Sequence, residues 1–197
     1  MILISGFKPF KKAKINPSEI LVQDLSHLSE VKTVVLPVEF ECAFTKLKES
    51  ILTVNPTCIL MFGQAAGRTH ICLEKIALNW IQTEFADESG VKPMKGKIST
   101  HDELAIMARF PIDDLFEKLK AQSLPVELSF SAGTFVCNNL YYKVLKEFPH
   151  IPSLFIHVPL LPEQVADIGA SSHGVAMHLD QMQKCLRAII DYCRLNI

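Results

Sequence analysis

Short apolar runs alternate with longer amphipathic segments along most of this chain of 197 residues. The runs are hydrophobic at nearly every position, which is typical of strands covered on both faces, whereas the longer segments repeat apolar residues at helical spacing. Strands that alternate with helices indicate parallel pairing. We therefore predict an α/β fold, a three-layer α/β/α sandwich around a mostly parallel sheet. The expected strands are residues 1–6, 33–38, 57–63, 126–130 and 153–158, and the expected helices are 16–25, 41–54, 111–122, 137–148 and 175–193.

Two segments are less regular. Residues 70–80 are long and apolar, so we expect one strand there, with Glu74 in its middle. Residues 84–104 are polar and contain glycine and proline, which predicts a loop with little regular structure. Because we find no internal repeat, low-complexity tract or linker, we expect a single domain over residues 1–197.

The overall composition argues against several classes of protein. The 20 basic and 21 acidic residues give a net charge of −1, so the electrostatic attraction that nucleic-acid binding needs is weak. The first ten residues read as a strand rather than as a signal peptide, and no run approaches the ~18 apolar residues of a membrane span. Six scattered cysteines form no CxxC pair, which favours a soluble protein of the reducing cytoplasm.

Neither a metal nor a cofactor is expected. The run GQAAGR, residues 63–68, lacks the Gly-Lys-Ser/Thr ending of a P-loop and the spacing of a dinucleotide fingerprint, so we interpret it as a substrate loop lined by backbone. The histidines other than His157 show no metal-ligand spacing such as HExxH. These histidines are His27, His70, His101, His150, His173 and His178.

The run SAGTFVCN, residues 131–138, places Cys137 just inside a predicted helix start. Its small residues allow a tight turn from a strand into that helix. A thiol in the first helical turn lies near the positive end of the helix dipole and near unpaired N–H groups, which favour the reactive thiolate and can hold an oxyanion. The alternative is a buried, unreactive cysteine.

The run FIHVP, residues 155–159, places His157 near the end of a predicted buried strand. Functional groups of open α/β sheets gather at the carboxyl ends of strands, so this imidazole can meet the Cys137 thiol there as base and nucleophile. A satisfied core histidine is the other interpretation. Glu74 is either an outward-facing residue beside Lys75 or a third group that hydrogen-bonds the imidazole and fixes its tautomer.

Two phenylalanines, Phe7 and Phe10, follow the first predicted strand in the run GFKPF. By default they are core or lid residues. Two aromatic faces can also hold a small flat ring between them.

Five blocks of the sequence resemble the pyroglutamyl peptidase I family, also called pyrrolidone-carboxylate peptidases, of peptidase family C15. The blocks span residues 5–164, and the most specific are those that contain Cys137 and His157. In chain order they read GFKPF…NPSE, LPVEF, GQAAGR…LEKIALN, SAGTFVCN and FIHVPLLPEQ.

The resemblance implies a cytoplasmic hydrolase, a thiol omega peptidase that removes the N-terminal pyroglutamyl residue from peptides. By matching motif, Cys137 is the nucleophile, His157 is the base and acid, and Glu74 orients the histidine. The family's fold is a single α/β/α sandwich, which often assembles as a homodimer or homotetramer.

The same matching implies a substrate pocket. Phe7 and Phe10 correspond to aromatic residues that flank the pyrrolidone ring, Phe135 and Val136 correspond to residues that line the same pocket, and Gln64 corresponds to a position beside the substrate.

The sequence departs from the family pattern in three places. Lys11 and Lys12 replace a glycine pair, which changes the expected loop shape. Glu84 stands where many microbial members carry arginine, and a negative charge near a thiolate disfavours that form. The Pro/Gly-rich stretch common after residue 90 is altered, which affects the expected closure of the pocket.

Two rival functions remain open on these residues. The same three side chains serve equally in a related cysteine amidase with another cyclic or N-blocked substrate. The departures at Glu84 and in the loop would also suit a non-catalytic homologue that binds pyroglutamate without turnover.

Overall fold

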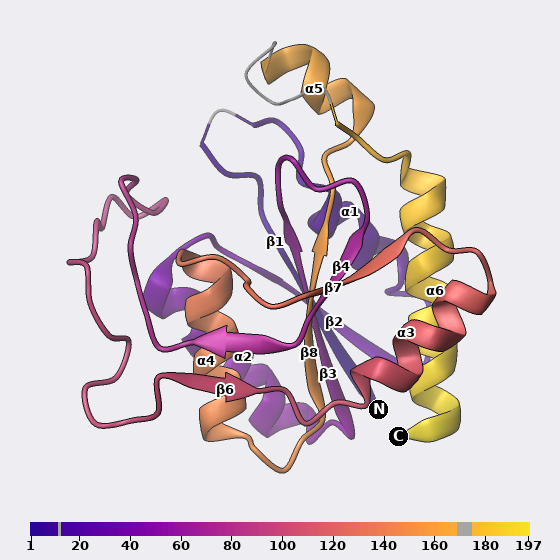
Figure 1. Cartoon of the computed structure of the whole chain (residues 1–197), viewed down its shortest axis with the longest axis horizontal. Coiled ribbons are helices and arrows are strands. Elements are labelled where there is room, and N and C mark those ends of the chain that lie inside the picture. The colour runs from indigo at the N-terminus through magenta and orange to yellow at the C-terminus, as the bar shows by residue number, and fades with distance from the viewer. Residues whose placement is uncertain (12, 169–174) are drawn as a thin grey trace.

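A six-stranded sheet forms the centre of the computed structural model, which describes residues 1–11, 13–168 and 175–197 (Figure 1). The strand order is β2-β1-β3-β8-β4-β7, and within this sheet only the β4–β8 pair is antiparallel. The predicted, mostly parallel α/β fold is thus confirmed. Lys12 and His173 lie outside the described residues. The strands are β1 (Ile2–Phe7), β2 (Val31–Leu36), β3 (Cys58–Gln64), β4 (Ile71–Glu74), β7 (Val126–Ser129) and β8 (Ser153–Val158).

The single strand expected over residues 70–80 is wrong. The chain leaves the central sheet at Lys75 and continues as β5 (Ile76–Leu78), which pairs with β6 (Ala105–Met107) in a separate two-stranded sheet. The Lys75 N–H donates to the Ser129 carbonyl, 2.7 Å away, whereas the Lys75 carbonyl accepts from the N–H of Ala108. One residue therefore belongs to two sets of backbone hydrogen bonds, and Glu74 becomes the last residue of β4.

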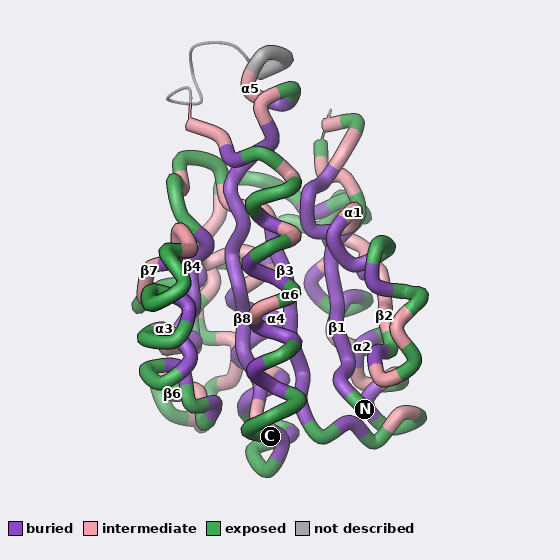
Figure 2. The backbone as a smooth tube through the Cα atoms, turned by 90° about the vertical axis from the view of Figure 1, so that its right-hand side faces the viewer, coloured by how far each residue is buried: buried purple, intermediate pink, exposed green. Residues whose placement is uncertain are grey.

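Helices cover both faces of the sheet (Figure 2). The core on one face includes side chains of α1, α3 and α6, and the core on the other includes side chains of α2 and α4. The last helix starts at Leu179 rather than at residue 175, because the Met177 N–H donates to the Leu160 carbonyl and His178 is extended. The helices are α1 (Pro17–Asp24), α2 (Phe40–Val54), α3 (Ile112–Ala121), α4 (Val136–Glu147), α5 (Pro162–Ile168) and α6 (Leu179–Asn196).

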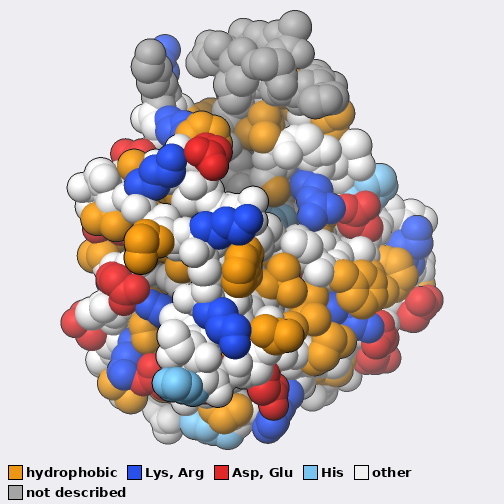
Figure 3. All heavy atoms as spheres, turned by 60° about the vertical axis from the view of Figure 1, so that its left-hand side comes forward, with side chains coloured by type: hydrophobic (Ala, Val, Ile, Leu, Met, Phe, Trp, Pro, Cys, Tyr) orange, Lys and Arg blue, Asp and Glu red, His pale blue; other side chains and the backbone are white. Residues whose placement is uncertain are grey.

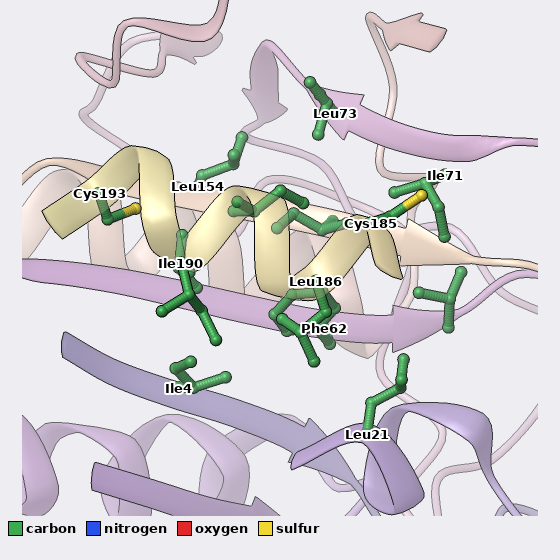
Figure 4. Close-up of a cluster of buried hydrophobic side chains, with 14 of the residues drawn as sticks. Ile4, Leu21, Phe62, Ile71, Leu73, Leu154, Cys185, Leu186, Ile190 and Cys193 are labelled. Atoms are coloured by element: carbon green, nitrogen blue, oxygen red, sulfur yellow. The ribbon is translucent and has the colours of Figure 1, made fainter. Parts of the chain in front are cut away.

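Alternating side chains of the central strands feed the two cores. Leu154 and Ile156 of β8 point to the face covered by α6, where Leu186 and Ile190 pack (Figure 4). Phe155, between them, points to the opposite face, where α2 and α4 lie. Because the central strands β1, β3 and β8 are buried on both sides, they read as nearly continuous apolar runs.

The loop expected at residues 84–104 is confirmed as largely irregular, with β6 directly after it. A single isolated bridge pairs Ile81 with Gly96 near its base. None of the helices in the described ranges combines the length and the apolar character needed to cross a bilayer.

Candidate active site

The candidate site lies on the α4 side of the central sheet, where β3 and β8 approach their carboxyl ends. Gly63 of β3 and His157 of β8 are register partners. A Cβ atom added to Gly63 would lie 3.0 Å from the Cys137 Sγ. The missing side chain of Gly63 therefore leaves the space that the Cys137 thiol occupies, one strand away from the imidazole.

Glu74 lies inside the protein and faces the imidazole of His157. Its Oε1 is 2.8 Å from the His157 Nδ1, and the two residues are 0% and 5% exposed. The outward-facing interpretation of Glu74 is thus wrong, and its Lys75 neighbour instead pairs with Asp113. The second carboxylate oxygen, Oε2, is buried and has no hydrogen-bond partner among the described residues.

The surroundings of His157 favour its protonated form. Burial opposes protonation, but hydrogen bonding to Cys137 and to Glu74, together with their charges, outweighs it and raises the pKa of His157 to about 9. A carboxylate on Nδ1 also leaves the opposite ring nitrogen free to serve the thiol.

Cys137 is the second residue of α4, as the sequence predicted. The N-cap is Phe135, whose side chain offers no capping hydrogen bond, so the first N–H groups of the helix are not satisfied by their own cap residue. The turn before the helix contains Gly133 at φ +79°, a left-handed conformation that favours glycine. These features place the thiol beside backbone donors at the positive end of the helix dipole.

Side-chain hydrogen bonds join that turn to two other segments. The Thr134 hydroxyl donates to the Gln82 carbonyl at 2.7 Å. Arg68, the last residue of GQAAGR, donates to the Ser129 hydroxyl and to the Ser131 carbonyl at 3.3 and 3.4 Å. The GQAAGR run thus supports the turn that carries the thiol, a role that the sequence pattern did not indicate.

Aromatic rings gather next to the thiol, and the sequence had marked only some of them. Phe10 and Phe135 have ring centroids 5.4 Å apart at an angle of 44°. Phe40 meets Phe135 edge to face at 5.2 Å. Phe40 was missed because it lies between the predicted strand 33–38 and the predicted helix 41–54, and appeared only at the end of the LPVEF block. Phe7 and Val136 are buried in the core of the same face, beneath this cluster.

Gln64 ends β3 and is held by a buried amide. Its Oε1 accepts from the Gln164 Nε2 at 2.8 Å. Gln164 also donates to the Ile15 carbonyl and accepts from the Leu161 N–H, and it is 4% exposed. The sequence marked PEQ only as part of a motif, whereas the structure gives Gln164 a definite supporting role.

Glu84 lies at the surface and faces solvent. Its side chain is 88% exposed and pairs with Lys92 at 3.2 Å. Water and this partner weaken its field, so its charge has less influence on a thiolate than the sequence suggested. Within the described residues, no three His, Cys, Asp or Glu side chains gather as metal ligands would.

Comparisons with known proteins agree on one family. Residues 1–194 match the profile of the family described as pyroglutamyl peptidase. The pyrrolidone-carboxylate peptidase of Finegoldia magna is 35% identical, covering 96% of this chain and 91% of its own, and that of Bacillus subtilis is 32% identical, covering 94% and 88%.

Solved structures give the same answer. The pyrrolidone carboxyl peptidase of Fervidobacterium islandicum superposes with a TM-score of 0.92 at 32% identity, covering 100% of this chain and 99% of its own. Pyroglutamyl peptidase I of Bacillus amyloliquefaciens superposes with a TM-score of 0.86 at 31% identity, covering 95% and 93%. This chain belongs to the pyroglutamyl peptidase family.

Proposed function

We propose that this protein is a cysteine peptidase that removes the pyroglutamyl residue from the N-terminus of peptides, with Cys137, His157 and Glu74 as its catalytic side chains. The observation that carries the proposal is the buried Glu74–His157 hydrogen bond beside the Cys137 thiol. Family membership supports the substrate class, because the matched relatives are named for this activity.

The proposed reaction begins with proton transfer from Cys137 to His157. A His157 pKa of about 9 allows the imidazole to hold this proton near neutral pH. The thiolate attacks the pyroglutamyl carbonyl, and N–H groups at the start of α4 hold the oxyanion. His157 then gives its proton to the departing amine as the peptide bond breaks, which leaves a thioester on Cys137.

The second half of the proposed reaction uses the same groups in reverse. His157, now neutral, takes a proton from water, and the hydroxide attacks the thioester. Collapse of the intermediate releases pyroglutamate and returns the thiol. Throughout, Glu74 holds one ring orientation and one tautomer, as the acid of a triad does.

The proposed specificity comes from the aromatic cluster and the lactam's polar groups. We expect Phe10 and Phe135, whose rings contact one another, to form a wall for one face of a small flat ring, with Gln64 at the end of β3 beside it. A site that hydrogen-bonds the lactam should reject proline, which has the same ring without the carbonyl. Cytoplasmic location and assembly as a homodimer or homotetramer remain predictions.

Replacing the proposed nucleophile should abolish turnover. We expect Cys137→Ser to lower kcat on a pyroglutamyl-coumarin amide by at least ~10³-fold, because the hydroxyl is a poor nucleophile in a site built for a thiolate. Fluorescence assays at neutral pH with reduced thiols measure this. Cys42→Ser is the matched control, since Cys42 is an exposed thiol and should retain full activity. Retained activity in Cys137→Ser would exclude the proposed mechanism.

The charge state of His157 gives a second test. Its resonances should titrate near pH 9 by NMR, and Glu74→Gln should lower that pKa because a favourable charge is removed. The folded pKa lies above the ordinary value, so this proton's contribution to stability is full below pH about 6.5 and is lost as pH rises through about 9. Urea unfolding should show that loss in the wild type more strongly than in Glu74→Gln. Titration near 6.5 in both proteins would contradict the account.

Gly63→Ala tests the space that the thiol needs. The new Cβ would lie 2.9 Å from the Phe155 Cζ and 3.0 Å from the Cys137 Sγ, so one of these side chains must shift. We expect lower kcat and slower alkylation of Cys137 by iodoacetamide, followed by mass spectrometry. Gly96→Ala serves as control, because nothing lies within 4 Å of its added Cβ. Equal alkylation rates in both variants would argue against close packing of the thiol on β3.

A further inference from the structure

Two segments that depart from the family pattern touch one another. The Lys11 N–H donates to the Glu88 Oε1 at 2.8 Å. The Lys11 ammonium lies 3.2 Å from the ring centroid of Phe85. The loop after β1 and the loop after β5 are therefore joined by one lysine, through its backbone and its side chain.

Lys11 also continues into the aromatic cluster. Its ammonium lies 5.2 Å from the ring centroid of Phe10, and the Phe10 ring in turn contacts the Phe135 ring at a tilted angle. Cations within about 6 Å of an aromatic face are attracted by it. The face of the molecule in Figure 3 shows basic side chains, lysine or arginine, next to hydrophobic ones. A row of contacts thus runs from Phe85 through Lys11, Phe10 and Phe135.

The row closes on itself through Phe40. The ring of Phe40 contacts Phe135, and its N–H donates to the Asp87 Oδ2 at 3.0 Å. Asp87 directly precedes Glu88, which accepts the hydrogen bond from the Lys11 N–H. We call this closed set the Lys11 cluster; it consists of Lys11, Phe10, Phe135, Phe40 and residues 85–88.

Hydrogen bonds fix the acidic end of the Lys11 cluster, which is formed by Asp87 and Glu88. The Asp87 Oδ1 accepts N–H bonds from Ser89 and Val91, at 3.0 and 2.9 Å, and Asp87 is 7% exposed. The Glu88 N–H donates to the Val38 carbonyl at 3.0 Å. The backbone of Glu88 is therefore held in place, and its carboxylate binds the loop that carries Phe10.

Lys11 needs such an attachment. Its φ of +57° lies in the left-handed region, which is unfavourable for a non-glycine residue. A glycine takes this conformation freely. The hydrogen bond that the Lys11 N–H donates to Glu88 and the contact with Phe85 hold the lysine there, and the conformation of Lys11 sets the direction of its neighbour Phe10.

We propose that Glu88 is a specificity-determining positioning residue, which holds Phe10 against Phe135 and so shapes the aromatic wall that receives a five-membered lactam. This inference rests on the proposed function, since the wall is taken to contact the pyroglutamyl ring. Glu88 acts through Lys11 and Phe10 and takes no part in bond making or breaking.

The experiment compares Glu88→Ala with Glu88→Gln. The alanine removes the oxygen that accepts from Lys11, whereas the glutamine keeps an equivalent oxygen. Glu88→Ala should raise KM for a pyroglutamyl-coumarin amide about fivefold, with kcat within about twofold, as expected for loss of one partly exposed hydrogen bond. Glu88→Ala should also lower the preference for the five-membered lactam over its six-membered homologue, because a loosened aromatic wall admits the larger ring.

Glu88→Gln should restore both the KM and the ring-size preference. Glu84→Ala is the matched control, because it removes an equal charge from the same loop but pairs only with Lys92 at the surface. The KM and the ring-size preference of Glu84→Ala should stay at the wild-type level. Urea midpoints should show that all variants are folded.

Three outcomes are decisive. An unchanged KM and ring-size preference in Glu88→Ala would overturn the inference while leaving the proposed function intact. A fall in kcat at constant KM would overturn it as well, because it would assign Glu88 to the chemical step. A wild-type protein that cleaves neither substrate would instead overturn the proposed function itself.

Discussion

The buried hydrogen bond between Glu74 and His157 is the interaction on which the rest of the site depends. Burying a carboxylate away from water is unfavourable unless it is paired, so the fold must bring a partner to Glu74. The antiparallel pairing of β4 with β8 does so, because it sets Cys72 opposite His157 and Glu74 one pleat farther along the same face. The single antiparallel pair in the central sheet thereby brings the carboxylate and the imidazole together.

The helix that carries Cys137 is tied to the same point. The Tyr141 hydroxyl, one turn further along α4, donates to the Glu74 carbonyl at 2.8 Å, and Tyr141 is fully buried. Residues four apart share one helix face, so Cys137 and Tyr141 approach the sheet together. The strand that presents the carboxylate and the helix that presents the thiol therefore form one rigid unit, with Gly63 providing the space between them.

Much of this arrangement was readable from the sequence, and the limits have physical causes. Five of the central strands and the start of α4 follow from periodicity and turn residues, because those signals are local. The orientation of Glu74 was undecided, since an acidic residue within an apolar strand gives the same sequence pattern whether it faces water or a buried partner. The break at Lys75 and the contact of Lys11 with Glu88 depend on residues far apart in the chain, which periodicity does not report.

Trapping the covalent intermediate tests the central claim most directly. Acid quenching during turnover of a pyroglutamyl-coumarin amide, followed by proteolysis and mass spectrometry, identifies the residue that carries the acyl group. The account predicts a pyroglutamyl thioester on Cys137 and on no other cysteine. A labelled Cys42 or Cys72, or an acyl group on a hydroxyl, would contradict the assignment of Cys137, His157 and Glu74 as one catalytic unit.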